Sequence, residues 1–181
     1  YTGRAKPKEI LDFVKEDLQK SLDLFAAAGK EWVNNVTWSK AATQMLGAEV
    51  YRWSAKVALG DQQPQAGDID KAEAFLNDVK NNTRFGLEAN FASVFQSNNE
   101  GNKELIFAIN YADGEATSSV SNFLYAEANI VSFYDKAGVR LGADPLNIKG
   151  TAIQRYEYTL DFCKSFDDKD SRKNATFYEY Y

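Results

Sequence analysis

The chain has 181 residues, 44% of them hydrophobic, a formal net charge of −5 and no histidine. This length allows one domain with a full core or two small lobes, whereas the negative charge argues against binding to nucleic acid or to an anionic membrane surface. Without histidine, and with Cys163 as the single cysteine, the chain lacks histidine-based catalytic dyads, internal disulfides and cysteine-based metal sites, so we predict no metal site and no cofactor.

The first predicted element is a half-buried helix that begins at Pro7 and ends near Gly29. Proline suits the first turn because its missing N–H would have no intrahelical partner there, and glycine is a common helix stop. Between these two residues apolar side chains recur at helical spacing, namely at Ile10, Val14, Leu18, Leu22 and Phe25.

A second helix is predicted over residues 38–59, with Thr37 as its N-cap. Apolar side chains occupy nearly its whole circumference, and a helix of that kind is normally wrapped by neighbours. We therefore expect it to be the central element, and we expect Trp38 and Trp53 to belong to the core.

The pattern weakens along the rest of the chain. A third helix is predicted to be capped by Asp68 or Asp70 and to stop at Asn81, with a buried stripe of Ile69, Ala72, Phe75, Leu76 and Val79. A short helix should follow around 91–95, then a strand over 105–111 that is buried on both faces. Residues 113–150 read as long loops with one short element near 129–134, and a last helix is predicted over 158–166.

These elements predict a mainly α fold, with tetratricopeptide-like antiparallel helix pairs, a loop-rich substrate-binding region and minor β structure. We expect residues 1–112 to form the helical scaffold, ending in the short strand. Residues 113–181 would then form a loop-rich part of the ligand-binding region.

Several segments resemble, in order, the SusD/RagB family of nutrient-binding outer-membrane lipoproteins. The resemblance lies in the first helix with Glu16-Asp17-Leu18, then Trp38-Ser39-Lys40-Ala41-Ala42, Val50-Tyr51-Arg52-Trp53-Ser54-Ala55-Lys56, Asp70-Lys71-Ala72-Glu73, Phe85-Gly86-Leu87, Glu104-Leu105-Ile106-Phe107-Ala108-Ile109 and Asp170-Ser171-Arg172. A polar insertion at 62–67 departs from the family pattern. The series covers nearly the whole chain, although each piece alone is loose.

This resemblance implies a function and a location. It implies non-catalytic binding of an oligosaccharide, or in some cases a peptide, on the outer face of the outer membrane, and delivery to a TonB-dependent SusC-like transporter. It also implies a lipid anchor, which we expect to lie outside this sequence, because full family members are far longer. No catalytic residue is predicted.

Candidate ligand-binding residues follow from the chemistry of sugar recognition. Sugars need flat aromatic faces against their C–H surfaces, and amide or carboxylate groups for their hydroxyls. Such side chains occur in segments that we expect to be loops, where binding residues concentrate. The candidates are Trp32, Asn122, Phe123, Tyr125, Phe133, Tyr134 and Asp135; the alternative for these aromatics is that they only fix the loops to the helices.

Two other functions stay open at this stage. The helix pairs alone would suit a helical-repeat scaffold whose sole partner is another protein. A glycosidase would need two carboxyl groups about 5–9 Å apart, but most acidic residues fall on polar helix faces. We expect Asp170 and Arg172 to form a structural ion pair or turn clamp.

Overall fold

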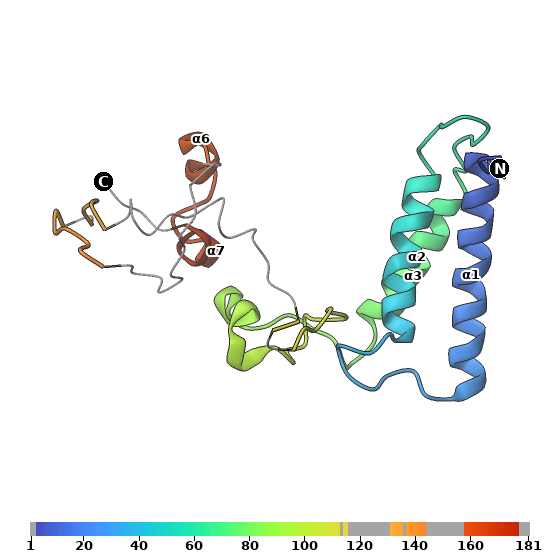
Figure 1. Cartoon of the computed structure of the whole chain (residues 1–181), viewed down its shortest axis with the longest axis horizontal. Helices are drawn as coiled ribbons and strands as arrows, with labels where there is room; N and C mark the ends of the chain where they lie inside the picture. The colour runs from blue at the N-terminus through green and yellow to red at the C-terminus, as the bar shows by residue number, and fades with distance from the viewer. Residues whose placement is uncertain (1–2, 113, 116–130, 136, 144–157, 178–181) are drawn as a thin grey trace. The chain divides into compact units, whose positions relative to one another are not determined.

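The computed structural model describes residues 3–112, 114–115, 131–135, 137–143 and 158–177 (Figure 1). By its internal contacts the chain divides into two units. The first unit is Tyr1–Ala89 with Ser93–Asn110, and the second is Asn90–Ala92 with Tyr111–Tyr181. The described residues are mainly helical, as predicted, and their only β pairing is two isolated bridges, Leu59–Gln62 and Tyr134–Arg140.

The first helix, α1 (Pro7–Ala28), begins and ends where the sequence predicts. Gly29 takes a left-handed conformation (φ 63°) and its N–H bonds to the Phe25 carbonyl at 3.1 Å, which closes the last turn. At the other end no side chain next to the helix caps it. Instead the Lys8 N–H donates to the carboxylate of Asp61, 53 residues away in the α2–α3 loop, at 3.1 Å.

The second helix, α2 (Lys40–Ser54), is shorter than the predicted range 38–59. Its N-cap is Ser39, not Thr37, because the Ser39 hydroxyl accepts the Ala42 N–H at 3.2 Å. Its end comes early because the Ser54 carbonyl accepts the N–H of Gln65 in the α2–α3 loop, at 2.9 Å. The Ser54 carbonyl therefore does not accept an N–H group from a further turn of the helix.

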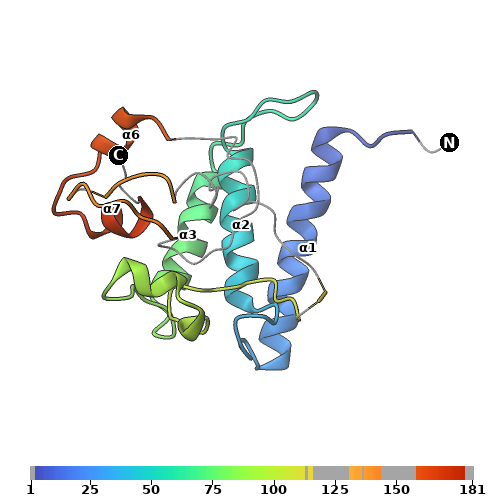
Figure 2. The same ribbon diagram turned by 60° about the vertical axis from the view of Figure 1, so that its left-hand side comes forward.

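Helix α2 lies between α1 and α3 (Asp68–Lys80), as Figure 2 shows. Small residues allow the close approach, and a Cβ added at Gly47 would lie 2.8 Å from Cε2 of Phe75 on α3. The prediction that Asp68 or Asp70 caps α3 is wrong: Gly67 is the N-cap, and the Asp68 carboxylate pairs with Lys15 of α1 instead. The predicted buried stripe is only partly right, since Ile69 and Leu76 are exposed.

The prediction that Trp38 and Trp53 belong to the core is also wrong, because they are 44% and 42% exposed. Trp38 lies at the start of α2, where its indole N–H donates to Thr43 Oγ1 at 2.8 Å and its ring packs edge-on against Phe107. Trp53 lines an open apolar groove of about 540 Å³ between α1 and α2. The other residues of this α1–α2 groove are Pro7, Ile10, Leu11, Val14, Glu49, Val50 and Leu59.

The segment after α3 contains two short 3₁₀ helices, η1 (Phe91–Phe95) and η2 (Ser97–Asn99), and the first agrees with the short helix predicted there. The predicted strand over 105–111 does not form. Its alternating pattern has no neighbouring strand to pair with among the described residues. A backbone bond from Ala108 N–H to the Asn35 carbonyl (2.8 Å) ties the segment to the α1–α2 loop. Its last part is exposed, with Ile109 and Tyr111 facing solvent.

The second unit contains α6 (Leu160–Lys164) and α7 (Ser171–Thr176). Helix α6 falls within the predicted range 158–166, but it starts only after Thr159, whose hydroxyl accepts the Phe162 N–H. Helix α7 was not predicted. The expected clamp between Asp170 and Arg172 is confirmed: the Arg172 Nε atom donates to both Asp170 oxygens at 2.9 and 3.0 Å, and Asp170 also caps α7.

Candidate functional site

The candidate site is a polar cavity of about 820 Å³ in the first unit. Three segments meet there: the loop between α1 and α2, the first turns of α2, and the end of α3 with the turn that follows it. The lining residues are Gly29, Lys30, Glu31, Trp32, Lys40, Ala41, Gln44, Asp78, Asn81, Asn82, Thr83, Arg84 and Phe85. The volume is within the range typical of small-molecule sites.

Hydrogen bonds between these segments fix the shape of the cavity. The Lys40 side chain pairs with Glu31 Oε1 at 2.6 Å, and the Lys40 N–H donates to the Glu31 carbonyl at 3.1 Å, so the loop is tied to the start of α2. On the opposite wall Gln44, which is almost fully buried, donates to Asp78 Oδ2 at 2.9 Å and so joins α2 to α3. The walls are therefore held in place before any ligand binds.

The turn after α3 supplies the amide groups of the cavity. Asn82 Oδ1 accepts the Arg84 N–H at 3.0 Å, which is the bond of an Asx turn. The neighbouring Asn81 side chain is exposed and makes no hydrogen bond to any residue that the structure describes. An exposed amide offers both a donor and an acceptor to a ligand hydroxyl.

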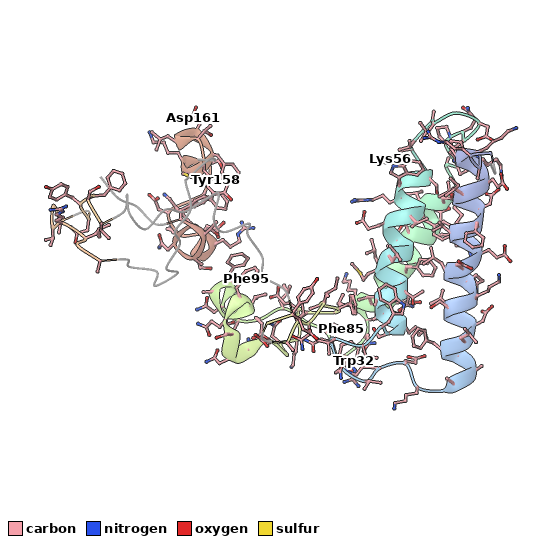
Figure 3. The ribbon with its side chains drawn as sticks, in the orientation of Figure 1. Trp32, Lys56, Phe85, Phe95, Tyr158 and Asp161 are labelled. Carbon is pink, nitrogen blue, oxygen red and sulfur yellow. The ribbon has the colours of Figure 1, made fainter. Side chains whose placement is uncertain are left out.

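Trp32 is the predicted site residue that lies in this cavity. Its ring is half-buried and contacts Phe85 edge-on, with the ring centroids 5.3 Å apart, and the Arg84 guanidinium lies 5.3 Å from the ring centroid (Figure 3). These contacts join the α1–α2 loop to the turn after α3. The ring therefore also has the structural role of fixing loops, and only part of its surface can face a ligand.

Phe133, Tyr134 and Asp135 lie together in a tight antiparallel turn of the second unit. The Leu141 N–H donates to the Phe133 carbonyl at 2.9 Å, and Tyr134 bridges to Arg140. Asp135 Oδ1 accepts the N–H groups of Ala137 and Val139 at 2.9 and 2.8 Å. Asp135 thus shapes the turn with its carboxylate, whereas the Tyr134 ring is exposed.

The other three predicted site residues, Asn122, Phe123 and Tyr125, lie outside the described residues, so their part in binding stays a prediction. Gln44, Asp78, Asn81 and Arg84 also line the cavity, and the sequence alone does not reveal them as site residues. Gln44 and its neighbour Thr43 interrupt the apolar residues of α2, and this is a usable signal, because a buried amide needs a polar partner. For Asn81 the sequence pattern indicates only a helix stop.

No group of three or more histidine, cysteine, aspartate or glutamate side chains gathers within the described part of the chain in a way that could hold a metal ion. None of the helices described there combines the length and the hydropathy that crossing a bilayer requires.

The chain is similar to several solved structures. A SusD superfamily protein from Bacteroides fragilis NCTC 9343 is 38% identical, with a TM-score of 0.86 over 98% of this chain and 37% of that one. A SusD superfamily protein from Bacteroides vulgatus ATCC 8482 is 25% identical, with a TM-score of 0.78 over 96% and 37%. A structure with a xylogluco-oligosaccharide is 19% identical, with a TM-score of 0.66 over 96% and 32%, and shows the fold alone.

The chain therefore spans between 32% and 37% of the length of these structures. No protein-family model matches the chain, and no curated protein matches it.

Proposed function

We propose, because this chain belongs to the SusD superfamily, that it serves in the non-catalytic binding of an oligosaccharide or another nutrient at the cell surface. In this proposal the bound ligand passes to a TonB-dependent SusC-like transporter in the outer membrane. The protein would face the outside of the cell and be held there by a lipid anchor.

The observation that carries the sugar assignment is the lining of the polar cavity. The exposed planar amides of Asn81 and Asn82 stand beside the carboxylates of Glu31 and Asp78. Planar groups of this kind can each bond two neighbouring hydroxyls, while the exposed part of an aromatic ring takes the C–H face of a sugar. Binding of this type uses hydrogen bonds and stacking, and it breaks no covalent bond.

Calorimetric titration with a xylogluco-oligosaccharide, and then with a panel of other soluble glycans, tests the proposal. Replacing Asn81 by alanine should weaken binding about fivefold, because a hydrogen bond between neutral groups contributes about 1 kcal/mol. The matched control is Asn77→Ala, one turn earlier on α3 and outside the cavity lining, which should bind as the unmodified protein does. Silence across all glycans together with firm peptide binding would overturn the sugar assignment.

The transporter and the anchor need a separate experiment. Co-purification from detergent-solubilised outer membranes should recover a large β-barrel transporter with the protein. Surface labelling of intact cells should reach the protein from outside. Recovery from the soluble cytoplasmic fraction, with a soluble partner, would contradict both expectations.

A second candidate function is that of a helical-repeat scaffold for protein–protein interaction. The α1–α2 groove favours it, since Ile10 and Trp53 expose apolar surface there and exposed apolar patches commonly mark interaction sites. Replacing Trp53 by serine should then abolish partner binding without changing glycan affinity. If the groove variant retains its protein partner and the cavity variant loses the glycan, the first function stands.

A further inference from the structure

The polar cavity of the first unit has more basic than acidic side chains. Its lining includes three basic residues, Lys30, Lys40 and Arg84, and two acidic residues, Glu31 and Asp78. The lining therefore has an excess of one positive charge, whereas the whole chain carries −5. A local excess of positive charge on an acidic protein attracts an anion to that place.

The two acidic side chains of the cavity already have hydrogen-bond donors, whereas two of its cations have no acceptor. Glu31 and Asp78 each accept a bond from another lining residue, at 2.6 and 2.9 Å. The Lys30 ammonium and the Arg84 guanidinium are exposed and form no ion pair or hydrogen bond with any residue that the structure describes. The cavity thus has unused charged donors, and a ligand that brings a carboxylate would supply the acceptor.

Arg84 is held in place at two points. Its backbone N–H donates to Asn82 Oδ1 at 3.0 Å, and its guanidinium lies 5.3 Å from the centroid of the Trp32 ring. An arginine that rests on an aromatic ring keeps its N–H groups for a carboxylate, which it can bind through two parallel hydrogen bonds. A side chain that is already ordered loses less conformational entropy when a ligand binds.

The size of the charge excess limits the kind of anion. One surplus positive charge in the lining matches a ligand with a single negative charge, whereas the net charge of −5 on the whole chain would repel a polyanion. The exposed amides of Asn81 and Asn82 remain beside the cations, and amides of this kind bond hydroxyl groups. These groups together suit a hydroxyl-rich ligand with one carboxylate.

We propose that the polar cavity selects an acidic oligosaccharide with one carboxylate-bearing sugar, whose carboxylate is bound by Arg84 and Lys30. The inference rests on the proposed function and deepens it, since it names the charge class of the ligand and the two residues that recognise the charge. A sulfate ester on the sugar would bring the same charge, and the test below separates it from a carboxylate.

The test is calorimetric titration with two pairs of probes that differ only in the acidic sugar. The first pair is sialyllactose and lactose, and the second is xylotriose with and without one glucuronic acid substituent. At least one acidic probe should bind about tenfold more tightly than its neutral counterpart, because hydrogen bonds between charged groups are stronger than those between neutral groups. The difference should shrink as salt is added, since both cations are exposed.

Variants of the two cations locate the contact. Arg84→Gln should weaken binding of the acidic probe about tenfold, and Lys30→Gln about threefold, because a lysine makes a single, more strongly hydrated contact. Lys30 contacts no other side chain among the described residues, so its variant decides the question if Arg84→Gln disturbs the Trp32 ring. The matched control is Lys71→Gln, the same change of charge at an exposed position of α3 outside the cavity lining, which should leave the affinity unchanged.

The outcomes separate this inference from the proposed function. If the protein binds a neutral glycan as tightly as the acidic probes, or if the Arg84 and Lys30 variants keep full affinity for an acidic probe, the inference is wrong and the proposed function stands. Tighter binding of a sulfated lactose than of sialyllactose overturns the carboxylate. If no glycan binds, acidic or neutral, the proposed function fails and the inference fails with it, even if an acidic peptide binds.

Discussion

Replacing Lys15 by methionine tests how the three long helices are held together. Lys15 of α1 forms an ion pair with Asp68 of α3, and each side chain is only 18% exposed. The buried hydroxyl of Ser54, on α2, donates to the same carboxylate oxygen. The Lys15 ammonium also lies 4.9 Å from the centroid of the Tyr51 ring. One ammonium group therefore contacts side chains of both neighbouring helices.

The expected loss in the free energy of unfolding lies between two limits. Removing one partner of a fully buried ion pair costs about 3–5 kcal/mol because the other charge stays uncompensated, whereas an exposed pair contributes about 0–1 kcal/mol. Asp68 is mostly buried but keeps the Ser54 hydroxyl as a donor. We therefore expect Lys15→Met to lower the free energy of unfolding by about 2 kcal/mol. Methionine retains the apolar stem, so the change isolates the charge.

A double-mutant cycle measures the coupling free energy between Lys15 and Asp68. Asp68→Asn should cost about 2 kcal/mol by the same argument, and the double variant should lose about 2 rather than about 4 kcal/mol. Urea unfolding followed by circular dichroism gives the free energies, and hydrogen exchange in α1 and α3 locates the effect. Arg52→Met, in an exposed pair with Glu49, should leave the unfolding midpoint unchanged. Additive losses in the cycle would refute the reasoning.

Three further predictions concern single groups. Gly47→Ala should destabilise the α2–α3 packing by about 1 kcal/mol, because the clash with Phe75 outweighs the better helix propensity of alanine; urea unfolding measures it, and an unchanged midpoint contradicts it. The side-chain hydrogen bonds from Arg172 hold the pKa of Asp170 at about 2, so the stability that Asp170 gives to α7 should be complete above its ordinary pKa near 4 and should be lost as the pH falls through 2; carboxyl-carbon NMR should show titration near 2 and not near 4. Burial raises the pKa of Tyr51 above 10, so stability should fall once the pH exceeds 10, where the unfolded chain releases this proton first; the replacement Tyr51→Phe should remove that part of the alkaline loss.

The sequence predicts correctly those helix ends that depend on interactions between neighbouring residues. Pro7 and Gly29 bound α1 as expected, because a helix start and a helix stop depend on the residues beside them. The N-cap of α2 was harder. Thr37 and Ser39 are both capping residues, and tertiary contacts select the second one, since the N–H of Lys40 is taken by the Glu31 carbonyl.

Interactions between distant segments explain what the sequence did not reveal. The strand predicted at 105–111 has the right alternation, but a strand needs a partner and the pattern does not contain one. The exposure of Trp53 depends on how α1 lies against α2. Because apolar residues occupy nearly the whole circumference of α2, the sequence does not indicate which of its faces stays uncovered. In the cavity, Trp32 was anticipated from its type, whereas Gln44 and Asn81 become neighbours only when α2 and α3 pack.

The bond from the Lys8 N–H to Asp61 has a practical consequence for protein engineering. The first turn of α1 depends on the α2–α3 loop, so a peptide tag inserted between Gly60 and Asp61 should fray that distant helix end. Pro64, three residues further on, is exposed and makes no such contact with the described residues. A fluorophore or affinity tag placed at that proline should therefore report on the protein without loosening its amino-terminal helix.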